Sequence, residues 1–177
     1  KSRRQVQRNL RKNNNFKTVA LIGYTNAGKT LLFNKLTKKK QSSRSRLFET
    51  LDTKISRVYL GENIYIGLID TVGFINNIPT SLIESFKATL EEVNTADILL
   101  NIVDINDLNA KQKIRVTKNI LKDTGVEKNK ISEMITIYNK IDLKDFKSSH
   151  HYKKNYISAL TGEGVSDLKK ILKNSLI

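Results

Sequence analysis

Short apolar runs alternate along the chain with longer segments whose apolar residues recur at helical spacing. Short runs rich in β-branched residues are typical of buried strands, and the longer periodic segments are typical of amphipathic helices. This pattern predicts six strands, at residues 17–22, 54–60, 63–70, 98–103, 134–138 and 156–158. The second and third strands are expected to form a hairpin with its turn at Gly61 and Glu62.

Helices are predicted between most of these strands. They cover residues 29–36, 81–93 and 110–122, and a last helix carries Val165, Leu168 and Leu172 on one face. Apolar strands that alternate with helices indicate an α/β fold with a doubly wound, mainly parallel six-stranded sheet flanked by helices. We expect residues 16–177 to form this one domain, and residues 1–15 to be a basic linker or helix end that precedes it.

A glycine-rich loop joins the first strand to the first helix and fits the pattern G-x-x-x-x-G-K-[ST]. Such a loop turns backbone N–H groups toward phosphate oxygens at a helix N-terminus. The lysine is then expected to reach the β- and γ-phosphates, and the last hydroxyl to bind Mg²⁺. The predicted nucleotide contacts are Gly23, Tyr24, Thr25, Asn26, Ala27, Gly28, Lys29 and Thr30.

A second motif follows the strand at residues 63–70. Asp70 ends this strand, where a carboxylate is expected to hold Mg²⁺ through water. The following residues complete the pattern D-x-x-G, in which the N–H of Gly73 is positioned to contact the γ-phosphate. The loop would then respond to the presence of that phosphate.

Base recognition is predicted at two loops that follow the last strands. Asp142, in an N-K-x-D motif, is expected to accept hydrogen bonds from guanine N1–H and the exocyclic amine. Lys140 would lie along the purine, and Asn139 would tie this loop to the phosphate loop. In the second loop, Ser158 and Ala159 follow the last strand, and the N–H of Ala159 is expected to contact guanine O6.

The composition of the chain excludes several classes of site. There is no cysteine, which excludes disulfides and thiolate metal sites. No apolar run approaches the ~18 residues of a membrane span, so no membrane partner is expected. His150 and His151 lie in a polar segment without the spacing of a metal site, and we assign them no function.

The formal charge of +15 is concentrated in two stretches that lack acidic residues, at positions 1–12 and 38–46. Clustered Lys and Arg bind nucleic-acid backbones by releasing counterions, which makes both stretches candidate RNA-facing segments. Lysine and asparagine are abundant throughout the chain, however, so a solvated surface explains the charge equally well.

Taken together, these motifs make the chain similar to the HflX family of ribosome-associated, translation-factor-related GTPases. The resemblance runs through residues 23–29, 48–52, 70–75, 85–86, 89–93 and 96–97. Two departures leave the required groups in place. Thr30-Leu31-Leu32 stands where the family usually has Ser-Thr-Leu, and Glu49 replaces a small residue.

The resemblance adds roles that the motifs alone do not give. It implies that Thr50 binds Mg²⁺ when GTP is present, with Thr53 as the alternative. Asn26 stands where some GTPases use an amide oxygen to bind K⁺ in place of an arginine finger, although an asparagine there is equally suited to capping the turn. The groups expected to act in catalysis are Lys29, Thr50, Gly73 and Asn26. The resemblance also implies a family N-terminal domain upstream of this segment.

The predicted function is that of a GTPase switch that binds GTP or GDP with Mg²⁺ and acts on the large ribosomal subunit and its RNA. Phe74 stands where many GTPases carry a glutamine that aligns water, so hydrolysis should be slow without a partner. Two alternatives remain: a nucleotide-gated RNA-binding module with negligible turnover, and an ATP-dependent enzyme. We expect a monomer in the cytoplasm, with an organelle matrix as the alternative.

Overall fold

A computed structural model describes residues 17–38, 54–74, 90–143 and 155–176. Its strands are β1 (Thr18–Ile22), β2 (Lys54–Gly61), β3 (Ile64–Asp70), β4 (Ile98–Asp104) and β5 (Ile135–Asn139). Its helices include α2 (Lys29–Thr37), α4 (Ala110–Asp123), α5 (Lys128–Ser132), the 3₁₀ helix η2 (Ile141–Leu143) and α6 (Val165–Asn174). Residues 90–95 are also helical.

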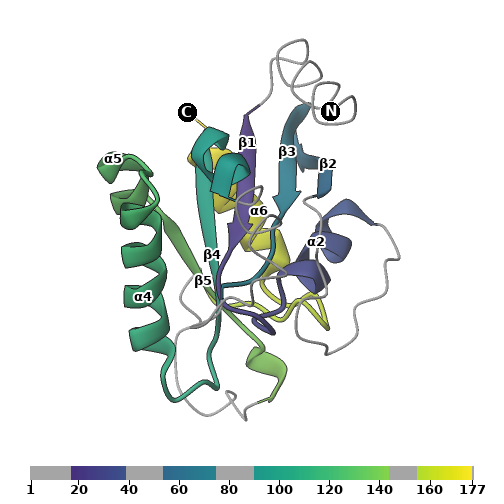
Figure 1. Ribbon diagram of the computed structural model, residues 1–177. Helices are drawn as coiled ribbons and strands as arrows, with labels where there is room; N and C mark the ends of the chain where they lie inside the picture. The colour runs from purple at the N-terminus through teal and green to yellow at the C-terminus, as the bar shows by residue number, and fades with distance from the viewer. Residues whose placement is uncertain (1–16, 39–53, 75–89, 144–154, 177) are drawn as a thin grey trace.

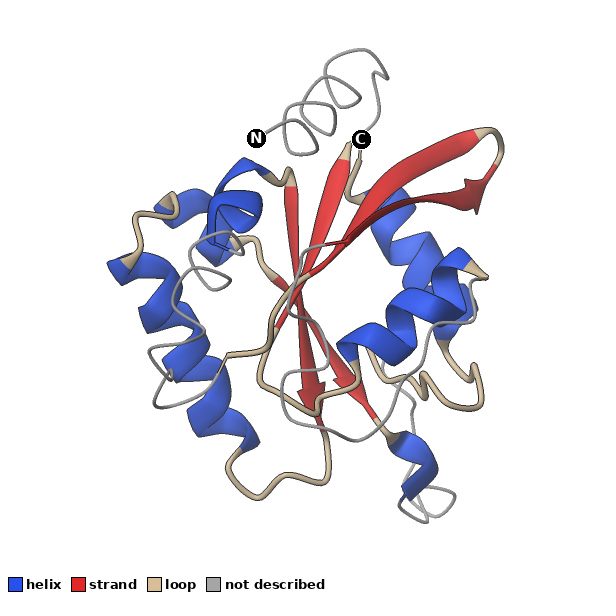
Figure 2. Cartoon of the chain, turned by 45° about the vertical axis from the view of Figure 1, so that its right-hand side comes forward, coloured by secondary structure: helices blue, strands red, loops and turns tan. Residues whose placement is uncertain are grey.

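The sheet has the order β2-β3-β1-β4-β5, and helices lie on both of its sides (Figures 1 and 2). Strands β3, β1, β4 and β5 are parallel, and only β2 runs antiparallel, as the partner of β3 in a hairpin. The prediction of a doubly wound, mainly parallel sheet is therefore confirmed. The parallel arrangement brings the carboxyl ends of four strands to one edge, where ligands bind in folds of this type.

The sheet has five strands in the described residues, so the prediction of six is wrong. The segment expected as the sixth strand makes one isolated parallel bridge, between Tyr138 and Tyr156. Its pairing is limited to a bond from the Tyr138 N–H to the Asn155 carbonyl and one from the Ile157 N–H to the Tyr138 carbonyl. The next N–H, that of Ser158, bonds to the carbonyl of Glu163, which turns the chain away from β5 before a ladder forms.

Smaller differences concern element ends. The hairpin turn lies at Glu62 and Asn63, one residue later than predicted, and both residues have positive φ, at 48° and 60°. The short helices α5 and η2 carry too few periodic positions to be predicted from sequence. Of the helix expected at residues 81–93, only the end from residue 90 lies within the described residues.

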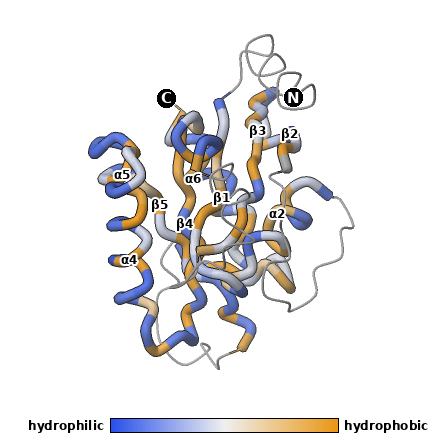
Figure 3. The backbone as a smooth tube through the Cα atoms, in the orientation of Figure 1, coloured by the Kyte–Doolittle hydropathy of each residue, from blue (hydrophilic) through white to orange (hydrophobic). Residues whose placement is uncertain are grey.

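Two apolar clusters hold the layers together. Alternate residues of β1 point to opposite faces, so that Val19 and Leu21 pack beneath α2 and α6, while Ala20 and Ile22 pack beneath α4 and α5. Figure 3 shows the apolar strands in the centre and the polar outer surface of α4 and α5. Among the described residues, no helix has both the length and the apolar character that crossing a membrane requires.

Candidate functional site

The loop between β1 and α2 is shaped by close backbone approaches. Gly28 has φ of 95°, and a Cβ there would lie 2.2 Å from the Asn139 side-chain nitrogen. At Gly23 a Cβ would lie 2.3 Å from the carbonyl oxygen of Ile102. Only glycine fits either position, because the neighbouring atoms occupy the space of any side chain. The two motif glycines therefore set the path of the loop at the start of α2.

Lys29 begins α2 and is buried, with 6% of its surface exposed. Its ammonium donates hydrogen bonds to the carbonyls of Gly23, at 3.1 Å, and Tyr24, at 2.8 Å. Burial lowers the pKa of Lys29 from 10.5 to about 8, against the opposing effect of the Asp70 carboxylate. The loop thus holds a desolvated cation that has no salt-bridge partner within its own turn.

Asp70 and Thr30 both lie at this end of the sheet. Asp70 is fully buried at the end of β3, directly beside Leu21 of β1, and Thr30 is buried in the first turn of α2. A carboxylate and a hydroxyl next to a phosphate site are the donor set that Mg²⁺ uses together with phosphate oxygens and water. Among the described residues, no group of three or more His, Cys, Asp or Glu side chains is arranged to hold a metal. Thr50 lies outside the described residues.

The segment after Asp70 is attached to the phosphate loop through the backbone. The Phe74 N–H donates to the Gly23 carbonyl and the Thr25 N–H to the Phe74 carbonyl, each at 3.0 Å. A Cβ at Gly73 would lie 2.8 Å from the Thr25 N and 2.9 Å from the Lys29 Nζ, so a glycine is required where the two loops touch. The Phe74 side chain is fully buried in the cluster beneath α4.

Asn139 joins three parts of the site. Its side-chain N–H donates to the Ala27 carbonyl at 2.9 Å, and its oxygen accepts from the Ala159 N–H at 2.9 Å. The residue is almost completely buried, so both bonds are shielded from water. The expected link from Asn139 to the phosphate loop is therefore present in the structure, and a second link reaches the loop at Ala159.

Lys140 and Asp142 are each held by a side chain from another loop, Lys140 by Asp104 and Asp142 by Ser158. The Lys140 ammonium pairs with Asp104 at 2.8 Å, and its carbonyl accepts from the Asn106 side chain at 3.0 Å. The Ser158 hydroxyl donates to the Asp142 carboxylate at 2.5 Å. Lys140 has φ of 69°, a conformation that these contacts help to maintain.

Three supporting residues were missed from the sequence. Asp104 ends an apolar strand as Asp70 does, so the rule that found Asp70 applies to it as well. Asn106 and Lys35 carry no such signal. The Lys35 ammonium, on α2, donates to the carbonyls of Leu160 and Thr161 at 3.3 and 3.1 Å, which fastens the loop that holds Ser158 and Ala159.

The described residues thus bring most of the predicted site to one edge of the sheet. Gly23 to Thr30, Asp70, Gly73, Asn139, Lys140, Asp142, Ser158 and Ala159 all lie in loops or element ends at the carboxyl end of the parallel strands. Asn26 is exposed at the top of the phosphate loop with φ of 61°. Most of the basic stretches at 1–12 and 38–46, and both histidines, fall outside the described residues.

The family model described as "50S ribosome-binding GTPase" matches residues 18–140. GTPase HflX of Caldanaerobacter subterraneus is 39% identical over 98% of this chain and 40% of that protein, and GTPase HflX of Escherichia coli is 36% identical over 90% and 38%. The chain thus spans about two fifths of the length of these relatives. A solved GTP-binding protein from Sulfolobus solfataricus in complex with GDP is 25% identical, with a TM-score of 0.67 over 97% of this chain and 55% of that chain.

Proposed function

Since this chain belongs to the 50S ribosome-binding GTPases, and among them to the HflX GTPases, we propose that it binds guanine nucleotides and hydrolyses GTP to GDP and phosphate. The observation that carries the proposal is the position of Asn139. Its amide bonds at once to Ala27 in the phosphate loop and to Ala159 in the second base loop. These two bonds hold the phosphate loop and the second base loop at a fixed separation. One nucleotide bound at this edge would contact both loops.

Guanine recognition is assigned to the two base loops. Asp142 lies with one carboxylate oxygen bonded to Ser158, which fixes the rotamer and leaves the carboxylate geometry suited to two further bonds from guanine N1–H and the exocyclic amine. The Lys140 stem would cover one face of the purine. The Ala159 N–H donates to the Asn139 side-chain oxygen at 2.9 Å, so a contact with guanine O6 would require this N–H to be shared or to change partner when the base binds. Adenine offers a different donor pattern on the corresponding edge, and this disfavours an ATP-dependent enzyme.

The phosphates are assigned to the loop at Gly23–Thr30. The buried ammonium of Lys29 and the loop N–H groups neutralise negative charge on the β- and γ-phosphates. Thr30 and Asp70, together with Thr50 from the resemblance, would hold Mg²⁺, which supplies charge neutralisation at the reacting phosphate. Gly73 lies close against Thr25 and Lys29, and we expect its N–H to contact the γ-phosphate.

Slow turnover in isolation follows from the placement of Phe74. Its ring packs in the apolar core beneath α4, so this position supplies no polar group to orient the attacking water. We propose that the large ribosomal subunit raises the rate, with the basic stretches contacting its RNA. Asn26, exposed on the phosphate loop, is proposed to bind K⁺ beside the phosphates.

The test is a comparison of nucleotide binding and multiple-turnover phosphate release in one preparation. GDP should bind far more tightly than ADP, and release of phosphate from GTP should be slow alone and faster with added large subunits, in K⁺ more than in Na⁺. An exposed-lysine variant, Lys128→Met, serves as the control for nonspecific charge effects. Equal affinity for GDP and ADP would contradict the guanine assignment. GTP binding without turnover, with or without ribosomes, would favour the nucleotide-gated binding module instead.

A further inference from the structure

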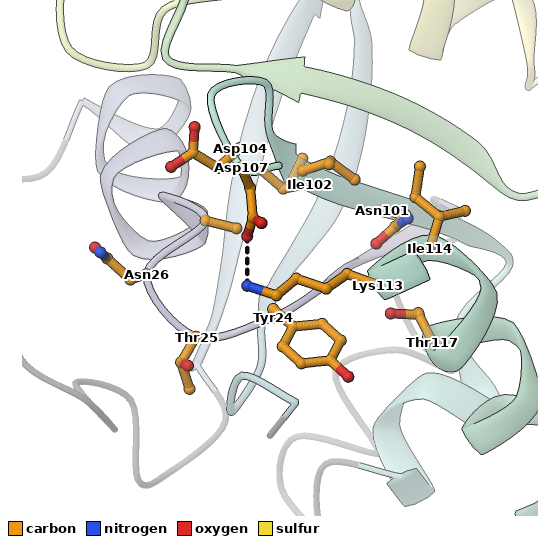
Figure 4. A pocket seen from close by; sticks show the side chains of 12 residues that line it. Tyr24, Thr25, Asn26, Asn101, Ile102, Asp104, Asp107, Lys113, Ile114 and Thr117 are labelled. Carbon is orange, nitrogen blue, oxygen red and sulfur yellow. Dashed lines mark hydrogen bonds and ion pairs between the residues drawn. The ribbon is translucent and has the colours of Figure 1, made fainter. Parts of the chain in front are cut away.

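Two cations close to the phosphate loop are each paired with a carboxylate. Lys113 pairs with Asp107 in the pocket between this loop and α4 (Figure 4). Lys140 likewise pairs with Asp104. Arg57 on β2 differs, because it is exposed and no carboxylate of the described residues lies within salt-bridge distance of it. Its charge is therefore available to a partner.

Arg57 belongs to a cluster of flat side chains on the β2–β3 hairpin, formed with Tyr59 and Tyr65, which we call the hairpin face. The guanidinium carbon of Arg57 lies 3.7 Å from the centroid of the Tyr65 ring, and the Tyr59 and Tyr65 ring centroids lie 5.1 Å apart. Tyr59 stands directly opposite Tyr65 in the ladder, so the two rings form a cross-strand pair. Tyr59 is 48% exposed. The hairpin face thus presents a ring and a guanidinium plane to solvent.

The sheet pattern places these side chains on a face that the helices leave open. Val58, Leu60 and Ile66 pack in the cluster beneath α2 and α6, so the alternate residues of both strands point to the opposite face. In Figure 1 the hairpin lies on the other side of the molecule from α4 and α5, the helices that pack on the opposite face at β4. Aromatic and arginine side chains gathered in the open are enriched where proteins bind partners.

Positive charge surrounds the hairpin face. The Lys169 ammonium of α6 donates to the Tyr59 carbonyl at 3.0 Å, and no carboxylate of the described residues pairs with it. Glu62 is the only carboxylate between positions 54 and 69, and it pairs with Lys173. Arg57 and Lys169 therefore favour an anionic partner. Because Lys169 already occupies a carbonyl of the outermost described strand, the addition of a peptide strand there is disfavoured.

We propose that the hairpin face binds an unpaired base of a single-stranded RNA, with the flanking phosphates beside Arg57 and Lys169. Bases stack on exposed aromatic rings and on arginine planes, and cations beside the stack attract the backbone. Tyr65 precedes Asp70 by five residues in β3, which is about 16 Å along the strand, so RNA and nucleotide occupy separate sites. The choice of RNA rests on the proposed function, whereas the stacking does not.

The binding test compares two fluorescein-labelled RNA hexamers, one of uridylates and one with the same phosphates but no bases. Fluorescence anisotropy is measured without nucleotide at about 0.1 M salt. Because charge contacts are the same for both hexamers, the ratio of their dissociation constants reports the contribution of the bases. The wild-type chain should bind the uridylate hexamer about tenfold more tightly than the abasic one.

Two variants separate stacking from charge. Arg57→Lys keeps the charge but loses the planar guanidinium, and Tyr59→Ala removes the exposed ring. Each should lower the preference for the uridylate hexamer about threefold or more. Tyr59→Phe retains the ring and should keep the preference. Arg115→Lys on α4 and Leu108→Ala, both at exposed positions away from the hairpin, are the matched controls and should leave the preference unchanged.

Equal affinity of the wild type for the two hexamers would overturn the proposal, as would an unchanged preference in both Arg57→Lys and Tyr59→Ala. Thermal unfolding curves identify a variant that fails to fold. If Tyr59→Ala does so, Arg57→Lys decides, because it changes only the exposed end of one side chain. Self-association in sedimentation that is present in the wild type and absent in Tyr59→Ala would assign the face to a second copy instead.

A GDP titration of the same preparation keeps this proposal separate from the proposed function. GDP binding without a preference for the uridylate hexamer would overturn the RNA site alone. A preference for the uridylate hexamer without GDP binding would overturn the guanine-nucleotide assignment and leave the stacking site supported.

Discussion

The phosphate loop and the base loops lie at one edge of the sheet but are built in opposite ways. At the phosphate end, tight glycine turns enclose the buried ammonium of Lys29, which donates to two backbone carbonyls of the same loop. At the base end, polar side chains are paired with one another before any ligand arrives, as Asp142 is with Ser158 and Lys140 with Asp104. One end holds a charge that is costly to bury, and the other holds a completed hydrogen-bond network.

This difference indicates how each end would contribute to binding. Keeping Lys29 protonated at neutral pH costs about 3 kcal/mol, because its pKa lies at about 8 instead of 10.5. A bound phosphate would offset this desolvation cost. The phosphate end would therefore gain affinity because binding stabilises the buried ammonium of Lys29. The base end gains specificity from preorganisation, since its side chains need not move to meet a purine.

The largest effect is expected at the base end. Asp142→Asn exchanges a carboxylate that accepts two bonds for an amide that presents a donor to guanine. GTP affinity should fall about 1,000-fold, and the preference should shift toward xanthine nucleotides. Calorimetric titration with GDP and XDP measures both changes, with the exposed Asp123→Asn as control. Unchanged GDP affinity would remove Asp142 from the base site.

At the phosphate end, Lys29→Met should separate affinity from stability. Nucleotide affinity should fall about 100-fold, because the phosphates lose a buried cation. The free protein should become more stable by about 1–3 kcal/mol, since an apolar side chain replaces a desolvated charge. Titration with GDP and urea unfolding without nucleotide measure the two effects. A variant destabilised in the absence of nucleotide would show that the Lys29 hydrogen bonds outweigh the burial cost.

Asn139→Ala should affect both ends at once, because this residue bridges them. The carbonyl of Ala27 and the N–H of Ala159 would each lose a buried partner. We expect a loss of about 2 kcal/mol in unfolding free energy and about a tenfold loss of GDP affinity. Chemical denaturation and GDP titration provide the measurements, with the exposed Asn129→Ala for comparison. Wild-type values for both would show that the two ends are independent.

The smallest effect is a pH dependence of GDP binding. Bound phosphate raises the pKa of Lys29, so the free protein must take up a proton above pH about 8, and affinity should fall by up to about tenfold per pH unit there. Titrations between about pH 7 and pH 9 in buffers of different ionisation enthalpy report the proton uptake. Lys29→Arg does not titrate in this range and should lose the dependence.

The lowered pKa of Lys29 also predicts how the unfolding free energy of the nucleotide-free protein depends on pH. Between pH about 8 and 10.5, the unfolded chain holds the Lys29 proton that the folded chain has released. The contribution of Lys29 to unfolding free energy therefore rises with pH in that window. A fall that depends on Lys29 would contradict the lowered pKa.

The sequence by itself was sufficient where one local pattern decides the structure. Buried strands were visible as apolar runs, and the motifs at Gly23–Thr30, Asp70–Gly73 and Asn139–Asp142 lie where strand-to-loop transitions predicted them. The last predicted strand failed for a local reason as well. The predicted sixth strand, at residues 156–158, was read from an apolar pattern of three residues. The turn at Ser158 allows this segment only one bridge to β5 among the described residues.

Tertiary structure decided which side chains hold the motifs in place and which groups are left unsatisfied. Nothing near Lys35 in the sequence indicates that it fastens a loop 125 residues away, and nothing near Asn101 indicates a buried carboxamide without partners behind the phosphate loop. These properties depend on distances between elements that only the packed sheet and helices determine. Local sequence fixes the type of each loop, whereas hydrogen-bond partners and desolvation depend on what the rest of the chain places beside it.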